Sequence, residues 1–284
     1  MALTIQSSPT VIPDMADSMK PLAELGFDAL RNVEILLSDI DDTITTDGVL
    51  TAQAYGALER LHRAGIKIVP ITGRPAGWCD HIARMWPVDG VVGENGAFSM
   101  VYDRARKVMR QHAFADAQTL RANRARLDAL SQRILAAVPG TGLASDQPYR
   151  LADLAIDFCE DVPRLPDAAI DRIVALFKEA GAQAKVSSIH VNGWFGDYDK
   201  LAMTRVLLQH EFQRDIAADN HRIVFVGDSP NDEPMFGAFA LSVGVANIRA
   251  LAHRLQAKPH YVAEGHSGHG FVELAERLLQ ARAA

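Results

Sequence analysis

An apolar segment runs directly into three carboxylates in the stretch Glu34-Ile35-Leu36-Leu37-Ser38-Asp39-Ile40-Asp41-Asp42-Thr43-Ile44. Its apolar residues, 35–37, fit a strand that is buried on both faces, as in a parallel sheet covered by helices. Open α/β sheets bind their ligands beyond the carboxyl ends of their strands. The stretch therefore predicts an α/β fold that places Asp39 and Asp41 at a ligand-binding edge.

Side chains two residues apart on extended backbone point the same way, so Asp39 and Asp41 can converge. Their like charges then repel unless a cation or a shared proton relieves them. A hard divalent ion with oxygen ligands provides this relief, and Mg2+ fits. Taken alone, the Asp-rich segment is equally compatible with a helix cap or with a turn that ends the strand.

The sequence after this stretch continues the pattern of a parallel sheet. A helix is expected from Thr51 to Gly65, followed by a strand at 66–71 that ends in the polar turn Thr72-Gly73-Arg74. Strand, helix and strand form a parallel crossover unit. This unit brings Thr72 to the same sheet edge as Asp39.

The segment 77–198 has a different character. It predicts a hairpin near 97–112, a strand over 150–158 and a single strand over 184–191, with helices between them. Hairpins and helices in this order indicate an α+β domain with an antiparallel sheet. This domain interrupts the first one instead of following it.

The parallel pattern resumes with a buried strand at 223–226, which ends in Gly227-Asp228-Ser229-Pro230-Asn231-Asp232. The predicted fold class is therefore α/β, a Rossmann-like parallel-sheet core with an inserted α+β domain. The expected organisation is an N-terminal arm at 1–30, a core domain built from 31–76 and 199–284, and an inserted domain at 77–198. Within the arm, a short amphipathic helix is expected from Met15 to Leu30.

Composition and charge argue against several classes of protein. The chain has 29 basic and 35 acidic residues, a net charge of -6 and no basic block, which disfavours a nucleic-acid partner. It has no apolar run of membrane-spanning length, and residues 1–30 lack the apolar segment of a secretory signal. Cys79 and Cys159 have no neighbours at metal-binding spacing and fit buried thiols in a reducing compartment. We expect a cytoplasmic protein without a membrane partner, and composition predicts no particular oligomeric state.

Four segments follow one another in the chain: Asp39-Ile40-Asp41-Asp42-Thr43, Thr72-Gly73-Arg74, Lys200 and Gly227-Asp228-Ser229-Pro230-Asn231-Asp232. In order and spacing they resemble the four motifs of the haloacid dehalogenase superfamily of phosphohydrolases. The insertion between the second and third motifs, with Gly93-Glu94-Asn95-Gly96-Ala97 near its start, resembles the Cof-like branch with its α/β cap. That branch includes sucrose-phosphate, trehalose-phosphate and mannosyl-phosphoglycerate phosphatases, and also phosphomannomutase.

The resemblance implies a role for each motif residue. Asp39 is expected to be the nucleophile that forms an aspartyl-phosphate, and Asp41 the acid and base that protonates the leaving group and then activates water. Thr72 and Lys200 complete the expected catalytic set. The residues expected to bind phosphoryl oxygens are Thr72, Gly73, Lys200 and Asn231. The residues expected to hold Mg2+ are Asp39, Asp41 through its backbone carbonyl, Asp228 and, in support, Asp232.

Each motif also has an ordinary structural alternative. Thr72-Gly73 fits a strand-ending turn, Lys200 an exposed helix residue and Asp228 a helix cap. The topology favours the functional interpretation, because it brings all three strand ends to one edge. Asp42, where many relatives carry glycine, is interpreted as structural.

The inserted domain is expected to close over the sheet edge and contact the substrate beyond its phosphate. The residues expected to select a sugar phosphate are Arg150, His190 and Asn192. Arginine can bind a carboxylate or a second phosphate, and asparagine can bind hydroxyl groups. His190 fits a satisfied strand residue equally well, and Trp194 fits better as packing at the hinge.

Together these patterns predict a Mg2+-dependent phosphatase that hydrolyses a small phosphorylated metabolite, a sugar phosphate, through an aspartyl-phosphate. Two alternatives stay open: a sugar phosphomutase that resembles phosphomannomutase, and a catalytically idle binding module on the same fold. Dehalogenase activity is disfavoured by Asp41, because a halide leaves without needing a proton.

Overall fold

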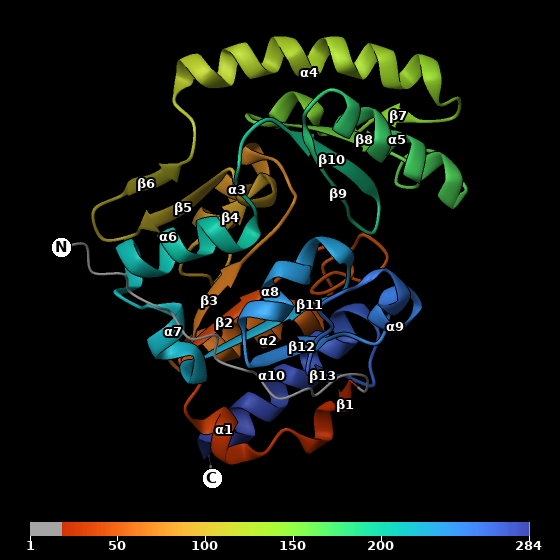
Figure 1. The fold of residues 1–284 in the computed structure, drawn as a ribbon. Helices are drawn as coiled ribbons and strands as arrows, with labels where there is room; N and C mark the ends of the chain where they lie inside the picture. The colour runs from red at the N-terminus through yellow and green to blue at the C-terminus, as the bar shows by residue number, and fades with distance from the viewer. Residues whose placement is uncertain (1–18, 284) are drawn as a thin grey trace, which may run out of the picture.

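The computed structural model describes residues 19–283, which contain a six-stranded parallel sheet with helices on both faces (Figure 1). The strands are, in spatial order, β1 (Lys20–Pro21), β13 (Tyr261–Val262), β12 (Leu241–Gly244), β11 (Ile223–Gly227), β2 (Ile35–Ser38) and β3 (Lys67–Pro70). All neighbouring pairs in this sheet are parallel. The prediction of an α/β fold with a parallel-sheet core is confirmed.

The α-helices within residues 19–283 are α1 (Phe27–Arg31), α2 (Ala52–Arg63), α3 (Ala76–Met85), α4 (Ala117–Ala137), α5 (Asp167–Glu179), α6 (Lys200–Phe212), α7 (Ile216–Asp219), α8 (Glu233–Ala238), α9 (Ile248–Leu251) and α10 (Ser267–Ala283). Six 3-10 turns join them: η1 (Leu22–Glu24), η2 (Glu94–Gly96), η3 (Gln147–Tyr149), η4 (Asn220–Arg222), η5 (Pro230–Asp232) and η6 (Ala252–Arg254). Helix α2 begins where predicted, since Thr51 Oγ1 accepts from the Ala54 N–H at 3.2 Å. None of these helices combines the length and apolar character needed to cross a bilayer.

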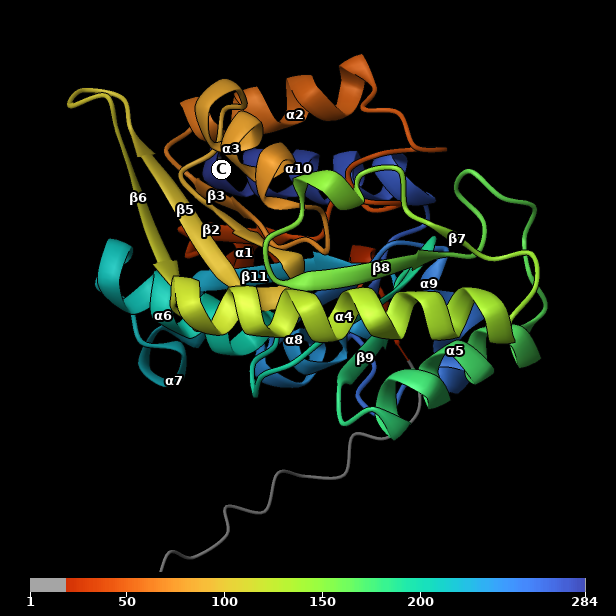
Figure 2. The ribbon, with the colours of Figure 1, turned by 90° about the horizontal axis from the view of Figure 1, so that it is seen from above.

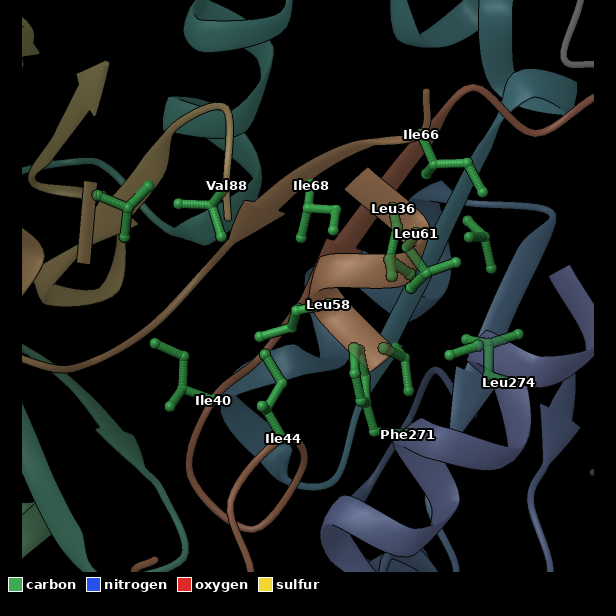
Figure 3. Packing of buried hydrophobic residues seen from close by; sticks show 14 of the residues in the cluster. Leu36, Ile40, Ile44, Leu58, Leu61, Ile66, Ile68, Val88, Phe271 and Leu274 are labelled. Carbon is green, nitrogen blue, oxygen red and sulfur yellow. The ribbon is translucent and has the colours of Figure 1, made fainter. Parts of the chain in front are cut away.

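Strand β2 is buried on both faces, as its continuous apolar run predicts. Leu36 packs into a cluster with α2 and α10 on one side of the sheet (Figure 3), whereas Ile35 and Leu37 pack with α6 and α8 on the other. Figure 2 shows these two pairs of helices on opposite sides of the sheet. The side chains alternate because successive residues of a strand point to opposite faces. Packing from both sides holds the carboxyl edge of the sheet in place.

A three-stranded antiparallel sheet extends the core. Its strands are β4 (Val91–Gly93), β5 (Phe98–Asp103) and β6 (Val108–Ala113). Val92 forms a parallel bridge with Ile71, just after β3, so β4 continues the main sheet. Phe98 and Met100 are buried in the same cluster as Leu36.

A four-stranded antiparallel sheet with α4 and α5 stands beyond the core, at the top of Figure 1. Its strands are, in spatial order, β7 (Gly142–Leu143), β8 (Asp153–Asp157), β10 (His190–Trp194) and β9 (Gln183–Val186). It has a hydrophobic cluster of its own, with members from Leu127 to Phe195. The limits 77–198 for the inserted domain stay a prediction. Because α3 and β4 to β5 pack on the core, we propose a narrower unit, residues 117–195, which we call the cap.

Two elements differ from the sequence-based expectation. The predicted helix Met15–Leu30 begins outside the described residues, and residues 19–30 form β1, η1 and the start of α1 instead. The predicted single strand at 184–191 consists of two antiparallel strands, β9 and β10, joined by a turn at 187–189. That turn contains Ser187 and Ser188 but neither glycine nor proline, so the strongest signals of a turn are missing.

Glu94 ties the cap to the core. Its buried carboxylate accepts N–H hydrogen bonds from Ala76 at 3.0 Å, at the start of α3. It also accepts from three successive residues that lead into β8: Leu151 at 2.8 Å, Ala152 at 2.6 Å and Asp153 at 3.2 Å. Burial raises the pKa of Glu94 to about 7, and the charge of Asp153 adds to the shift, while the backbone donors oppose it.

Replacing Glu94 by glutamine is expected to destabilise the protein. The amide nitrogen of glutamine is a donor, so buried N–H groups lose their acceptor, at a cost of about 1–3 kcal/mol. The control is Glu59→Gln, since Glu59 forms an ion pair with Arg63 on the surface of α2; it should change stability by less than about 0.5 kcal/mol. Urea unfolding at pH 8 measures both variants. A Glu94→Gln midpoint equal to that of the wild type would contradict the role given to Glu94.

Candidate active site

Three neighbouring strands, β3, β2 and β11, end at the same edge of the sheet. Ser38 is in register with both Pro70 and Val226, so the residues that follow these positions come together. The motif residues that follow are Asp39, Thr72 and Asp228, all of them buried. The sheet therefore gathers the first, second and fourth motifs in one place.

The third motif reaches this edge from the first turn of α6. Lys200 Nζ donates to Asp39 Oδ1 at 2.6 Å and to Asp232 Oδ1 at 2.7 Å, and its side chain is only 1% exposed. Burial by itself lowers the pKa of an ammonium group, but the charges of Asp232 and Asp39 outweigh it and raise the pKa of Lys200 above its ordinary value. Lys200 thus stays charged between two carboxylates.

The position of α6 depends on a close backbone approach at Gly96. This residue has a φ of +105°, and a Cβ there would lie 2.0 Å from the carbonyl oxygen of Asp199. Asp199 is the N-cap of α6, and its side chain accepts from the Ala202 N–H at 2.7 Å. Glycine satisfies both the backbone angle and the contact.

Three buried carboxylates, those of Asp39, Asp228 and Asp232, each offer an oxygen within 4.8 Å of the others. Asp232 is committed to hydrogen bonds, because its Oδ2 accepts from the N–H groups of Asp228 at 3.0 Å and Ser229 at 3.3 Å. Asp228 Oδ1 is buried and has no hydrogen-bond partner among residues 19–283. Burial raises the pKa of Asp228 well above its usual range, and the charge of Asp39 adds to this. Asp39 and Asp228 therefore fit an oxygen-ligated divalent cation.

Asp41 lies outside this group of three carboxylates. Arg74 Nε lies 2.9 and 3.0 Å from the two oxygens of Asp41, and Arg74 Nη2 lies 2.8 Å from Oδ1. Arg74 also contacts the cap, where Nη2 donates to Glu160 Oε1 at 2.8 Å and Nη1 lies 3.4 Å from Asp146. His190, on cap strand β10, lies 2.9 Å from the other Glu160 oxygen. The Arg74 guanidinium therefore links Asp41, the predicted acid and base, to the cap.

The space between Asp39, Asp41 and the cap is small. Its volume is about 10 Å³, close to the room for one water molecule. Gly73 and Asn231 line this space, as does His190 from the cap. Among the residues predicted to bind phosphate, Thr72 and Lys200 are buried and do not line it. The cap is thus closed on the core.

Two of the predicted cap residues serve the cap's own network of charges. Arg150 borders the small space, but its guanidinium donates to Asp146 at 2.9 and 3.0 Å, to Asp153 at 3.0 Å and to the Gly73 carbonyl at 2.8 Å. Asn192 does not border the space, and its Nδ2 donates to Asp153 Oδ2 at 2.8 Å. A contact of either residue with substrate would require these hydrogen bonds to break.

Sequence analysis gave no functional role to Arg74 or Glu160. Arg74 is the last residue of the predicted polar turn, so a basic residue at that place was the available signal. Glu160 follows β8 in the segment Phe158-Cys159-Glu160-Asp161, with no spacing that relates it to a motif. The contacts of Glu160 with Arg74 and with His190 form only when the cap folds. These two contacts lower the pKa of Glu160 to about 2. His190 contributes most and Arg74 next, against the opposing effect of burial.

Known proteins resemble this chain in sequence and in fold. A family model for haloacid dehalogenase-like hydrolases matches residues 36–124, which include the first two motifs. The sucrose-phosphatase of Synechocystis sp., solved with sucrose and phosphate, covers 87% of this chain and 98% of its own at 19% identity, with a TM-score of 0.60. The C-terminal domain of trehalose-6-phosphate phosphatase from C. albicans covers 95% of this chain and 99% of its own at 14% identity, with a TM-score of 0.67. A search of curated protein sequences found no match.

Over residues 36–124 the chain is therefore similar in sequence to the haloacid dehalogenase-like hydrolases, and it shares its fold with the two solved phosphatases. The resemblance predicted from the four motifs, and with it the prediction of a hydrolase, is confirmed.

Mg2+ is expected to stabilise the protein against heat, because it would satisfy Asp228 Oδ1 and offset the repulsion with Asp39. At 100 times its Kd the ion adds about 2.7 kcal/mol. Asp228→Asn should remove most of this effect and raise the Tm in EDTA, since one buried carboxylate becomes neutral. Asp128→Asn is the matched control, because Asp128 pairs with Arg124 on the exposed face of α4. An Mg2+-induced rise in Tm that is as large in Asp228→Asn as in the wild type would contradict the site.

Proposed function

We propose that the protein is a Mg2+-dependent phosphatase that hydrolyses a small phosphorylated metabolite, a sugar phosphate, in the cytoplasm. The observation that carries the proposal is the buried Lys200 ammonium shared by Asp39 and Asp232, next to the unpaired oxygen of Asp228. A phosphate monoester is anionic, so its hydrolysis needs positive charge and a nucleophile in line with the leaving group. Two structural relatives are phosphatases of sucrose and trehalose phosphates, which supports the same reaction class.

In the proposed reaction an Asp39 carboxylate oxygen attacks phosphorus, and the bond from phosphorus to the leaving oxygen breaks. Asp41 donates a proton to that oxygen, so the alcohol leaves neutral. Water then attacks the phosphorus of the aspartyl-phosphate, Asp41 takes the proton of the water, and the bond from phosphorus to Asp39 breaks. The products are the alcohol and inorganic phosphate, and both carboxyl groups return to their starting state.

The remaining motif residues hold the phosphoryl group in this proposal. The residues that would contact phosphoryl oxygens are Thr72, Gly73, Lys200 and Asn231. Bound Mg2+ would neutralise charge on the phosphoryl group. Its proposed ligands are Asp39, the backbone carbonyl of Asp41 and Asp228, with Asp232 keeping Asp228 and Lys200 in place.

Arg74 couples this chemistry to the cap. The carboxylate oxygens of Asp41 are occupied by contacts with Arg74, whereas the first half-reaction needs Asp41 to face the leaving group and donate a proton to it. The Arg74–Asp41 contact must therefore loosen before the leaving group is protonated. Glu160 offers Arg74 a second carboxylate at 2.8 Å, so the guanidinium can keep a partner when it releases Asp41.

Replacing Asp39 by asparagine is expected to lower kcat for p-nitrophenyl phosphate by about 10³-fold or more, because the nucleophile is removed. The matched control is again Asp128→Asn, far from the motifs, which should keep the wild-type rate. Phosphate release in Mg2+ measures both variants. Wild-type activity in Asp39→Asn would contradict the nucleophile assignment.

The phosphomutase alternative predicts a different dependence on added compounds. A phosphatase should release phosphate in Mg2+ without a sugar bisphosphate, and EDTA should abolish that release. A mutase should isomerise a sugar phosphate with little net release and should require the bisphosphate to stay phosphorylated. A phosphate-release screen over a metabolite library, with and without EDTA, separates the two. Inactivity on the whole library would favour the idle binding module.

A further inference from the structure

A larger cavity lies beside the closed site. Its volume is about 380 Å³, which falls within the range of small-molecule sites. Ser187 and Ser188, in the turn between β9 and β10, line both this cavity and the small space next to Asp39. The two spaces are therefore neighbours, separated by that turn.

The cavity offers the room that the small space lacks. Asp228, one of the proposed Mg2+ ligands, lines the cavity together with Asp42. The cavity therefore reaches the proposed catalytic centre. Asp42 has a φ of +55°, a backbone angle that aspartate adopts more readily than most residues and glycine most readily of all. On the other side of the small space, Arg74 is closed against Asp41 and Glu160. The part of a substrate beyond its phosphate therefore has its room in the larger cavity.

Apart from one ion pair between core and cap, the acids that line the cavity belong to the core and its arginine belongs to the cap. Asp42 and Asp228 belong to the core, whereas Arg164 belongs to the cap and follows β8. Arg254, in η6, also lines the cavity, but its Nη2 lies 3.1 Å from Asp167 Oδ2 at the start of α5. This ion pair joins core and cap at the wall of the cavity and neutralises Arg254.

Arg164 has no such neutralising partner. No carboxylate of residues 19–283 forms an ion pair with it, and its contacts are with Cys159 Sγ at 3.8 Å and with the ring of Phe158 at 5.7 Å. A guanidinium binds a carboxylate or a phosphate through two parallel hydrogen bonds. From the sequence we expected Arg150 to bind such a group, but its guanidinium already donates to Asp146, Asp153 and the Gly73 carbonyl. Within residues 19–283, Arg164 is thus the arginine that lines this cavity without a carboxylate partner, and it is exposed to solvent.

We propose that the leaving group of the substrate occupies this cavity and carries a second anionic group, which Arg164 binds. This inference rests on the proposed phosphatase function and narrows its substrate class. The substrate is then a phosphate monoester of a sugar acid or polyol acid, or a bisphosphate, instead of a neutral sugar phosphate. A carboxylate and a second phosphate would bind to Arg164 in the same way. The test therefore includes esters of both kinds.

The test compares phosphate esters that carry a second anion with related esters that lack one. With full-length protein in Mg2+, kcat/KM is measured for glucose 6-phosphate, 6-phosphogluconate and glucose 1,6-bisphosphate, and for glycerol 3-phosphate and 3-phosphoglycerate as a second matched set. At least one anionic member should exceed its neutral counterpart by about tenfold or more, as expected for a charge-assisted hydrogen bond. The carboxylate and bisphosphate arms then identify which anion is preferred.

The same ratio is measured in variants of Arg164. Arg164→Gln should bring the ratio of anionic to neutral substrate close to one, and Arg164→Lys should restore part of the preference, since the charge is kept. The matched control is Arg172→Gln, because Arg172 lies on α5, pairs with Glu179 at 2.8 Å and does not line the cavity. Its ratio should equal that of the wild type.

Two results would overturn the proposal, and they differ from a failure of the phosphatase function. Hydrolysis of neutral and anionic esters at equal rates, or a ratio that Arg164→Gln leaves unchanged, would contradict the proposed binding of a second anion. Neither result would contradict the phosphatase function. Absence of phosphate release from every ester, p-nitrophenyl phosphate included, would remove the proposed function and this inference with it.

Discussion

The buried ammonium of Lys200 is the interaction on which the candidate site depends. Asp39 and Asp232 share it from different segments of the chain, and each would be an uncompensated charge in the interior without it. Removing one partner of a buried ion pair costs about 3–5 kcal/mol. The sheet positions Asp39, the turn after β11 positions Asp232, and α6 positions the ammonium. Folding of the core and assembly of the site are therefore one event, since none of the three charges is satisfied until all three segments are in place.

The cap is attached to the core by two kinds of contact. Glu94 and Arg150 bind backbone groups, the first at the start of β8 and the second at the Gly73 carbonyl. Arg74 and Glu160 join the two parts through side chains alone. Backbone attachments keep their partners as long as the local chain keeps its conformation, whereas a side-chain ion pair can exchange partners when a ligand arrives. Movement of the cap is thus expected to pivot near the start of β8 and to open on the side of Glu160.

Sequence signals predicted the core because each of its elements carries a local one. The apolar run of β2, the cap at Thr51 and the polar turn after 66–71 each had a direct physical meaning, and the parallel sheet then gathered the motifs. The cap was less predictable, because the roles of its residues depend on side-chain contacts that form only in the folded protein. Nothing in the sequence showed that Arg150 would be fully engaged by carboxylates of its own segment. The turn at 187–189 has serines but no glycine or proline to mark it. The sequence of the hairpin at 97–112 does not reveal which layer its apolar side chains join.

Gly96 has a consequence for how the function of related chains is read. It carries no charge and makes no proposed contact with substrate, yet its missing side chain is what lets the carbonyl of Asp199 come so near. A methyl group at this position would push the first turn of α6 outward and pull the ammonium away from both acids. A related protein could therefore keep every charged motif residue and still be a pseudoenzyme. Inspection of its motif residues alone would not reveal the loss of activity.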